Sequence, residues 1–166
     1  VPGFAEPDAN GVWQGFDVAV CRAVAAAVLN DSDAIEFVPT TGKTRFTALA
    51  SGEIDMLARN TTWTFSRDVD LKFEFVGVNY YDGQGFMAKA DLGVSSATEL
   101  DGATVCIQTG TTTELNLADF FRSNNMSYEP VPVETGSEAV TNYMAGACDV
   151  FTTDRSALAA RRANME

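Results

Sequence analysis

One segment of the chain decides the fold: Ser51-Gly-Glu-Ile-Asp-Met-Leu-Ala-Arg-Asn-Thr-Thr-Trp-Thr-Phe-Ser-Arg-Asp68. It opens on Gly52, a residue type that commonly ends helices. The apolar side chains of Ile54, Met56 and Leu57 follow over the length of a buried strand. A mostly polar run comes next and ends at Arg67. Because ligands of open α/β sheets bind beyond the carboxyl ends of the strands, this pattern predicts a strand that ends at a ligand site.

The polar end of the segment has the composition of a carboxylate site. A guanidinium presents two parallel N–H donors that match a carboxylate, and it stays protonated at working pH. We therefore interpret Asn60, Thr62 and Arg67 as a cradle for a small carboxylate. Spacing alone leaves an alternative open, in which Arg67 is an ordinary surface arginine after a threonine-rich turn.

Strands and helices alternate along the rest of the chain. Helices are predicted from Asp17, over 44–51, from the Thr111 region to Phe121, over 137–145 and from Ser156, and strands over 35–39, 54–58, 76–81, 103–108, 128–133 and 148–153. This order with short connections is typical of parallel sheets wrapped by right-handed crossovers, so the fold class is α/β. Both halves follow the same plan, which predicts two similar lobes.

A second candidate site segment lies in the second half, at Thr109-Gly-Thr-Thr-Thr-Glu114. Gly110 lets the backbone approach a ligand, and the opening turn of the next helix presents unpaired N–H groups that favour an anion. We expect the Thr111 hydroxyl and the Thr112 backbone N–H to hold the same carboxylate as Arg67. A capping box formed by Thr111 and Glu114 is the alternative, and the two readings are compatible. The segment is not a phosphate loop, because it lacks the G-K-S/T ending.

Composition excludes several function classes. The net charge of −12 argues against binding to nucleic acid or to anionic membranes. No apolar run approaches the roughly 20 residues that span a bilayer. The chain has no histidine, so histidine catalysis and histidine metal ligation are excluded, and we expect neither a metal nor a cofactor.

Cys21, Cys106 and Cys148 lack the C-x-x-C spacing of zinc or redox motifs. In an oxidising compartment Cys106 and Cys148 are candidates for a disulfide, because both begin predicted strands of the same half. Such a bond would stabilise the fold by roughly 3–4 kcal/mol. Three buried thiols that act as small hydrophobic side chains are the alternative.

The ordered motifs resemble those of a known family. They are Gly15-Phe-Asp-Val-Ala-Val20, Gly52-Glu-Ile-Asp55, Thr62-Trp-Thr-Phe-Ser-Arg67, Phe75-Val-Gly-Val-Asn-Tyr-Tyr81 and Gly102-Ala-Thr-Val-Cys-Ile-Gln-Thr-Gly-Thr-Thr112. Together they are similar to the periplasmic receptors of ABC importers for polar amino acids, and to the general L-amino-acid branch in particular. Each motif is weak alone, but the ordered set is specific and covers nearly the whole chain.

The resemblance implies a periplasmic-binding-protein-like fold of two lobes with mostly parallel sheets flanked by helices. We expect the first lobe at 1–84, a hinge crossover at 85–90 and the second lobe at 91–166. The resemblance also implies an L-amino acid as the ligand, the membrane permease of the importer as the partner, and a periplasmic location. In the family the aspartate at the place of Asp154 takes the α-amino group. The residues alone favour a different role, in which Asp154 caps the helix that begins at Ser156.

Two other functions on the same fold stay open. One is a dehydratase that acts on a carboxylated ring, and it would need a general acid in an apolar pocket, for which the sequence shows no motif. The other is the ligand-sensing domain of a receptor kinase, which would use the same binding residues. Transport without catalysis is the leading prediction.

The chain also departs from the family pattern. Family members begin with a strand upstream of Val1 and continue past the second lobe, so we expect a fragment, with its signal peptide removed. A sheet without its first strand exposes unpaired N–H and C=O groups, and pairing with another copy would satisfy them. In the related branch a cysteine at the place of Cys21 pairs with one on the upstream strand.

Overall fold

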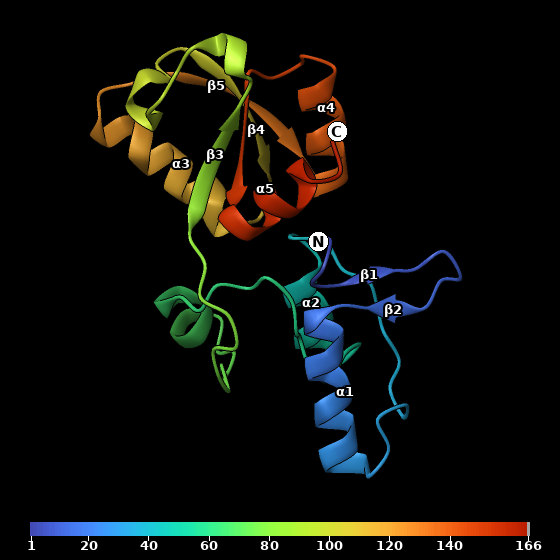
Figure 1. Cartoon of the computed structure of the whole chain (residues 1–166). Helices are drawn as coiled ribbons and strands as arrows, with labels where there is room; N and C mark the ends of the chain where they lie inside the picture. The colour runs from blue at the N-terminus through green and yellow to red at the C-terminus, as the bar shows by residue number, and fades with distance from the viewer. Residues whose placement is uncertain (166) are drawn as a thin grey trace.

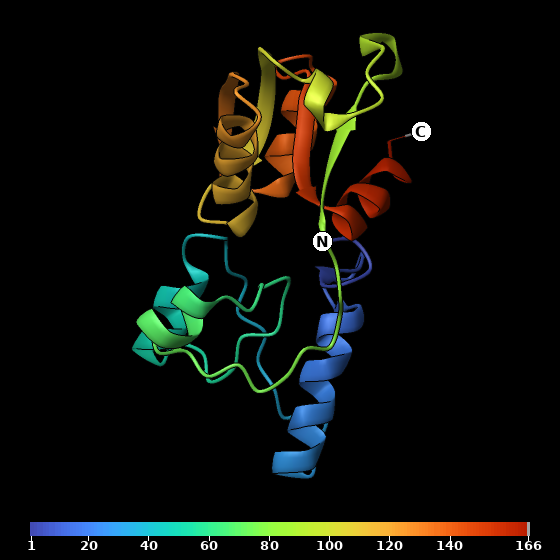
Figure 2. The same cartoon turned by 90° about the vertical axis from the view of Figure 1, so that its left-hand side faces the viewer.

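The computed structural model describes residues 1–165, which form a front lobe (residues 1–83) and a back lobe (residues 84–165) (Figure 1). The chain passes between the lobes once, in an extended segment (Figure 2). No helix within the described residues is long and apolar enough to cross a membrane.

The back lobe is built on a four-stranded sheet with the order β3-β6-β4-β5. The strands are β3 (Gln84–Ala88), β4 (Ala103–Gln108), β5 (Tyr128–Val133) and β6 (Val150–Asp154). Strand β4 runs parallel to both β5 and β6, whereas β3 pairs antiparallel to β6. The α/β class is therefore confirmed, with a mixed sheet in which three strands are parallel.

Helices cover both faces of this sheet, since alternate side chains of a strand point to opposite faces. Val105 and Ile107 of β4 pack with Leu117 of helix α3 (Thr112–Ser123). Cys106 between them packs on the other face with Tyr143 of α4 (Gly136–Met144). A third helix, α5 (Arg155–Arg162), follows β6 directly and also packs on the α4 face through Leu158. Single helical turns at Ala90–Leu92 and Ala97–Glu99 complete the lobe.

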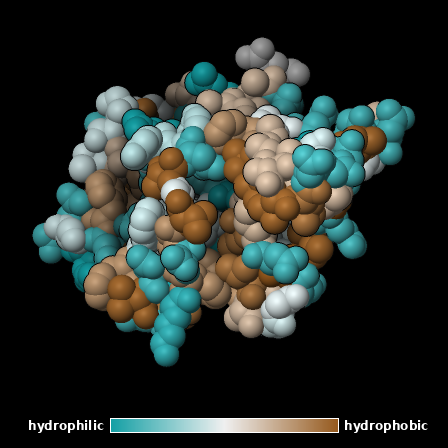
Figure 3. Space-filling view, turned by 90° about the horizontal axis from the view of Figure 1, so that it is seen from below, coloured by the Kyte–Doolittle hydropathy of each residue, from teal (hydrophilic) through white to brown (hydrophobic). Residues whose placement is uncertain are grey.

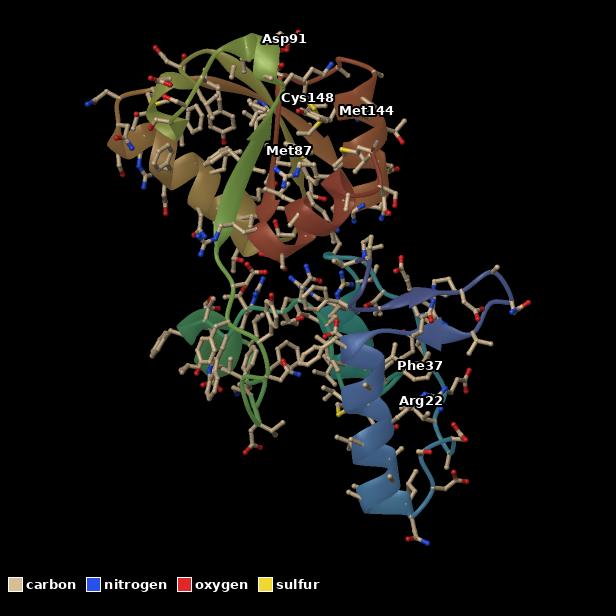
Figure 4. The ribbon with its side chains drawn as sticks, in the orientation of Figure 1. Arg22, Phe37, Met87, Asp91, Met144 and Cys148 are labelled. Carbon is tan, nitrogen blue, oxygen red and sulfur yellow. A yellow bond between two sulfur atoms is a disulfide. The ribbon has the colours of Figure 1, made fainter. Side chains whose placement is uncertain are left out.

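Cys106 and Cys148 are joined in a disulfide, as the sequence suggested. Their Cα atoms lie 5.6 Å apart, and the bond closes a loop with a sequence separation of 42. Both residues are buried in the cluster between the sheet and α4 (Cys148 is labelled in Figure 4). Cys21 is a free, half-buried thiol.

The front lobe contains the predicted helices. Helix α1 (Phe16–Leu29) begins one residue before the expected Asp17, and α2 (Arg45–Ser51) matches the predicted range. Gly52 ends α2 in the left-handed region at φ 75°, so its predicted role is confirmed. A short antiparallel hairpin precedes α1, and its strands, β1 (Glu6–Pro7) and β2 (Trp13–Gln14), have two residues each. A π-helical turn covers Ser66–Asp70.

The parallel sheet predicted for the front lobe is wrong within the described residues. The segments 35–39, 54–58 and 76–81 contain no ladder strand. A cavity of about 690 Å³ is lined by the first two of these segments and by apolar side chains of α1, including Val24 and Val28. Figure 3 views this end of the molecule, where apolar side chains gather around a hollowed surface. An apolar run favours an extended backbone, but a ladder also needs a neighbouring strand, and none of the described segments lies there.

The predicted hinge range, 85–90, falls mostly on β3, which is paired with β6 along its whole length. The chain therefore enters the back lobe just before this range, next to Gly83. The Gly83 backbone oxygen accepts a hydrogen bond from Arg155 N at 2.7 Å, so the segment that connects the lobes is bonded to the start of α5. A change of torsion angles at the crossing remains a prediction.

Candidate functional site

A cavity of about 380 Å³ lies between the lobes and is lined by both of them. Four of the six predicted ligand residues line it: Asn60 and Thr62 from the front lobe, and Thr112 and Asp154 from the back lobe. Strands β4 and β6 are parallel neighbours, so their carboxyl ends lie at the same edge of the back-lobe sheet. Thr112 follows β4 and Asp154 ends β6 at this edge, which faces Asn60 and Thr62 of the front lobe (Figure 1).

These four residues are hydrogen-bonded to one another across the cavity. Asn60 Nδ2 donates to Asp154 Oδ2 at 3.0 Å, between residues 94 apart in sequence. The hydroxyls of Thr62 and Thr112 are 3.2 Å apart. Each pair joins one front-lobe residue to one back-lobe residue, so the polar groups of the two walls satisfy each other in this closed arrangement.

Arg67 is 7% exposed and lies behind the front wall rather than on it. Its Nη1 donates to the backbone oxygen of Thr62 at 2.8 Å, and its guanidinium carbon lies 5.0 Å from the centre of the Phe46 ring. Burial lowers the pKa of the Arg67 guanidinium, and the Asp154 carboxylate opposes that shift. The predicted cation and the predicted acid therefore act on each other across the cleft, although their roles toward a ligand remain predictions.

Thr111 serves as the N-cap of α3. Its Oγ1 accepts from Glu114 N at 3.2 Å and donates to the Gln108 oxygen at 2.7 Å. The Glu114 carboxylate accepts a hydrogen bond from Gly110 N at 2.9 Å, whereas in a standard capping box it would accept from Thr111 N, so the box is displaced by one residue. Because its hydroxyl proton is used within the loop, Thr111 has less donor capacity for a ligand than the sequence suggested.

Asp154 stands at the start of α5, but its side chain makes no capping bond there. Asp82 at the crossing takes that role, since its Oδ1 accepts from Ser156 N at 3.4 Å and from Gly83 N at 2.8 Å. The Asp154 carboxylate is thereby left to face the cleft. Burial raises the pKa of this carboxyl, against the lowering effect of the Asn60 hydrogen bond.

Two further arginines of the front wall did not emerge from the sequence: Arg45, which is 2% exposed, and Arg59, which is half-buried. Asn60 contacts both of them. Its backbone oxygen accepts a hydrogen bond from Arg45 Nη1 at 3.1 Å, and its Oδ1 accepts one from Arg59 Nε at 3.4 Å. A local signal did exist for Arg45. It occupies the first turn of α2, where a cation opposes the helix dipole, and such local conflicts gather at functional sites.

The front wall is consequently electropositive. Within residues 1–165 neither Arg45, Arg59 nor Arg67 has a carboxylate at ion-pair distance. Burial, reinforced by Arg59 and Arg67, lowers the pKa of Arg45 to about 9. Buried cations without a paired acid are costly, so an anion at this wall is favoured.

Aromatic side chains form another part of the cavity lining. Trp63 stacks on Phe75 with ring centres 5.3 Å apart, and its Nε1 donates to Asp68 at 2.9 Å. Tyr80 and Tyr81 line the cavity while staying exposed. Trp63 is thus a natural fluorescent reporter of the cleft.

The chain matches the sequence profile of the bacterial extracellular solute-binding proteins, family 3, over residues 1–164. The chain belongs to this family. It is 67% identical to the glutamate/glutamine/aspartate/asparagine-binding protein BztA of Rhodobacter capsulatus. It is 57% identical to the general L-amino acid-binding periplasmic protein AapJ of Rhizobium johnstonii. The alignments cover 98% and 99% of the chain and 48% of each relative.

A solved structure shares the fold. The periplasmic binding protein of Brucella ovis with glutathione bound is 54% identical, with a TM-score of 0.90 over 95% of this chain and 50% of that one. This solute-binding chain therefore spans about half the length of the relatives that it matches, and the family suggested by its motifs is confirmed.

The raised pKa of Asp154 predicts a pH dependence for its expected pairing with the ammonium group of a ligand. Only the ionised carboxylate pairs with an ammonium group, so affinity should fall as the pH drops through the pKa of Asp154 in the free protein. Because burial raises that pKa, the loss of affinity should begin at a higher pH than for an exposed aspartate.

Calorimetric titration of the ligand over a pH series checks this prediction. The residual affinity of Asp154→Asn should not change over the same range, and an equal decline in that variant would contradict the assignment.

Proposed function

We propose that this chain binds an L-amino acid between its lobes, as part of the periplasmic receptor of an ABC importer. The observation that carries the proposal is the cavity between the lobes, with the half-buried Asp154 on its back wall and the buried Arg45 and Arg67 behind its front wall. An amino acid carries one charge of each sign, and the two walls offer one partner for each.

In this proposal Arg67 pairs with the α-carboxylate and Asp154 with the α-ammonium. The Thr112 backbone N–H and the Thr111 residue support the carboxylate from the start of α3, where N–H groups favour an anion. Asn60 and Thr62 exchange their present partners across the cleft for polar groups of the ligand. A ligand thus replaces hydrogen bonds that already exist, and the closed lobes exclude water, which strengthens the charged pairs.

The relatives support the amino-acid class of ligand and the partner. Their names are those of amino-acid-binding proteins, one of them periplasmic, and a further relative, YhdW of Escherichia coli O157:H7, is named as a putative amino-acid ABC transporter-binding protein. The glutathione held by the Brucella ovis protein contains a free α-amino and α-carboxylate pair, so it presents the same head group. The relatives are named as binding proteins, and we propose no catalytic role.

A screen of the twenty L-amino acids against the full-length protein tests the proposal. Thermal unfolding should shift upward for the ligands that bind, because a ligand that binds only the folded state stabilises it. Calorimetry and the fluorescence of Trp63 then give the affinities. Asp154→Asn is the matched variant and should lose most of the shift. No upward shift with any amino acid would overturn the proposed function.

A further inference from the structure

We propose that Arg45 is a positioning residue that holds both walls of the ligand site and responds to the carboxylate of the ligand. The inference rests on the proposed function, since it concerns how this cleft closes on an amino acid. Arg45 differs from Arg67 because it contacts the back lobe as well as the front lobe.

Arg45 lies at a seam where the lobes touch closely. A Cβ atom on Gly42 would stand 2.8 Å from the Thr109 oxygen, and one on Gly110 would stand 3.2 Å from the Gly42 backbone. At the edge of the seam Lys43 Nζ pairs with Glu134 at 3.2 Å. The turn before α2 and the loop before α3 therefore pack backbone against backbone.

The guanidinium of Arg45 reaches across this seam. Its Nη1 donates to the Asn60 oxygen and to Thr61 Oγ1, each at 3.1 Å, and these residues directly precede Thr62. Its Nη2 donates to the Gly110 oxygen at 3.4 Å, directly before Thr111. One side chain thus fixes the backbone on both sides of the predicted carboxylate cradle.

Arg45 also carries a charge that no carboxylate pairs with directly, although Asp154 across the cleft partly offsets the loss of solvation. Among the described residues it has no carboxylate at ion-pair distance, and its Nε is buried without a hydrogen-bond partner. Its guanidinium carbon lies 4.8 Å from the centre of the Phe46 ring, on which Arg67 also rests. Burial and the neighbouring arginines lower its pKa, which shows how poorly the charged form is accommodated.

Closure of the lobes is therefore costly at Arg45 unless an anion arrives. Gly110 belongs to the back lobe, so separating the lobes returns Nη2 of Arg45 toward water. Closing the empty cleft buries the charge again, and the Asp154 carboxylate, which makes no direct ion pair with Arg45, compensates only part of that cost. A ligand carboxylate between the walls offsets that cost, so Arg45 favours closure on a carboxylate over closure on a neutral group.

The test is a thermodynamic cycle between Arg45 and the ligand carboxylate, in the full-length protein. The probes are the L-amino acid that binds most tightly and its α-carboxamide, and calorimetry gives both affinities for the wild type and for Arg45→Met. Replacing the carboxylate by the amide should weaken binding to the wild type strongly. In Arg45→Met that penalty should be smaller by about fivefold or more, which is a coupling of the size seen between groups that interact.

Arg22→Met is the matched control. Arg22 lies on α1, away from the other lobe, where its guanidinium carbon is 5.8 Å from the centre of the Phe37 ring and it pairs with Asp33 (Figure 4). In Arg22→Met, replacing the ligand carboxylate by the amide should weaken binding by the same factor as in the wild type. Arg45→Gln is the second variant, for use if Arg45→Met does not fold, and its penalty should shrink in the same way.

The outcomes separate the two proposals. If no amino acid binds the wild type, the proposed function fails. If amino acids bind and the folded Arg45 variant loses affinity for both probes equally, Arg45 has a merely structural role and the inference is overturned. A reduced amide penalty confined to the Arg45 variants supports it.

Discussion

Arg67→Ala is expected to weaken L-amino-acid binding by the full-length protein by about 2–3 kcal/mol, or roughly 30- to 150-fold in Kd. The proposed pair between this guanidinium and the α-carboxylate is buried, and removal of one partner leaves the other desolvated without compensation. Isothermal titration calorimetry measures the effect directly.

Arg67→Lys separates the charge from its geometry. A lysine keeps the positive charge but lacks the fork that matches a carboxylate, so an intermediate loss is expected. Arg22→Ala, in the same lobe and remote from the cleft, should bind as the wild type does. Because Arg67 also contacts Thr62 and Phe46, thermal unfolding of each variant must show a folded protein. Unchanged affinity in folded Arg67→Ala protein would remove Arg67 from the site.

Removal of the disulfide is expected to have the largest effect on stability. Cys106 and Cys148 have a sequence separation of 42. In the chain-entropy account, a disulfide that closes a loop of this size lowers the entropy of the unfolded chain and so stabilises the folded protein by about 4 kcal/mol. The double variant Cys106→Ala/Cys148→Ala should lose about that much free energy of unfolding. Denaturant unfolding of the oxidised, reduced and double-variant proteins measures it.

Cys21→Ala is the control for this experiment, because Cys21 is a free thiol in the front lobe. Its unfolding midpoint should stay close to that of the wild type and should not respond to reductant. Mass spectrometry without reductant should also find Cys106 and Cys148 in one linked peptide. Equal stability of oxidised and reduced protein would contradict the prediction.

The back lobe shows how far local patterns reach. The strands 103–108 and 128–133 were predicted with the bounds of β4 and β5, because each strand is a short run between clear turn residues. Helix α3 and its Thr111 cap were also predicted, since a capping residue acts on its near neighbours in the chain. The antiparallel pairing of β3 with β6 was not predicted, because it joins segments that no local pattern connects.

The front lobe and the site show where these patterns stop. The apolar run at 54–58 was read as a sheet strand, yet its backbone has no ladder partner in the described residues. Arg67 was predicted at the cleft from the polar end of its segment, whereas Asp154 was placed there by the family resemblance, since the residues alone favoured a helix cap. Arg45 was missed, since its contacts with Asn60 and with Gly110 of the other lobe join segments that lie far apart in sequence. Its position against the helix dipole was the one local sign.

Residues close together in the chain suffice to determine the helices, most of the back-lobe strands, the caps and the residue types of the site, because dihedral preference, capping and side-chain periodicity act over a few residues. The family also followed from local motifs. The meeting of Asn60 with Asp154, the burial of Arg45 at the seam and the absence of a front-lobe ladder within residues 1–165 depend on contacts between distant segments. Such contacts form only when the lobes pack, since their energy lies in desolvation and in partners that no neighbouring residue supplies.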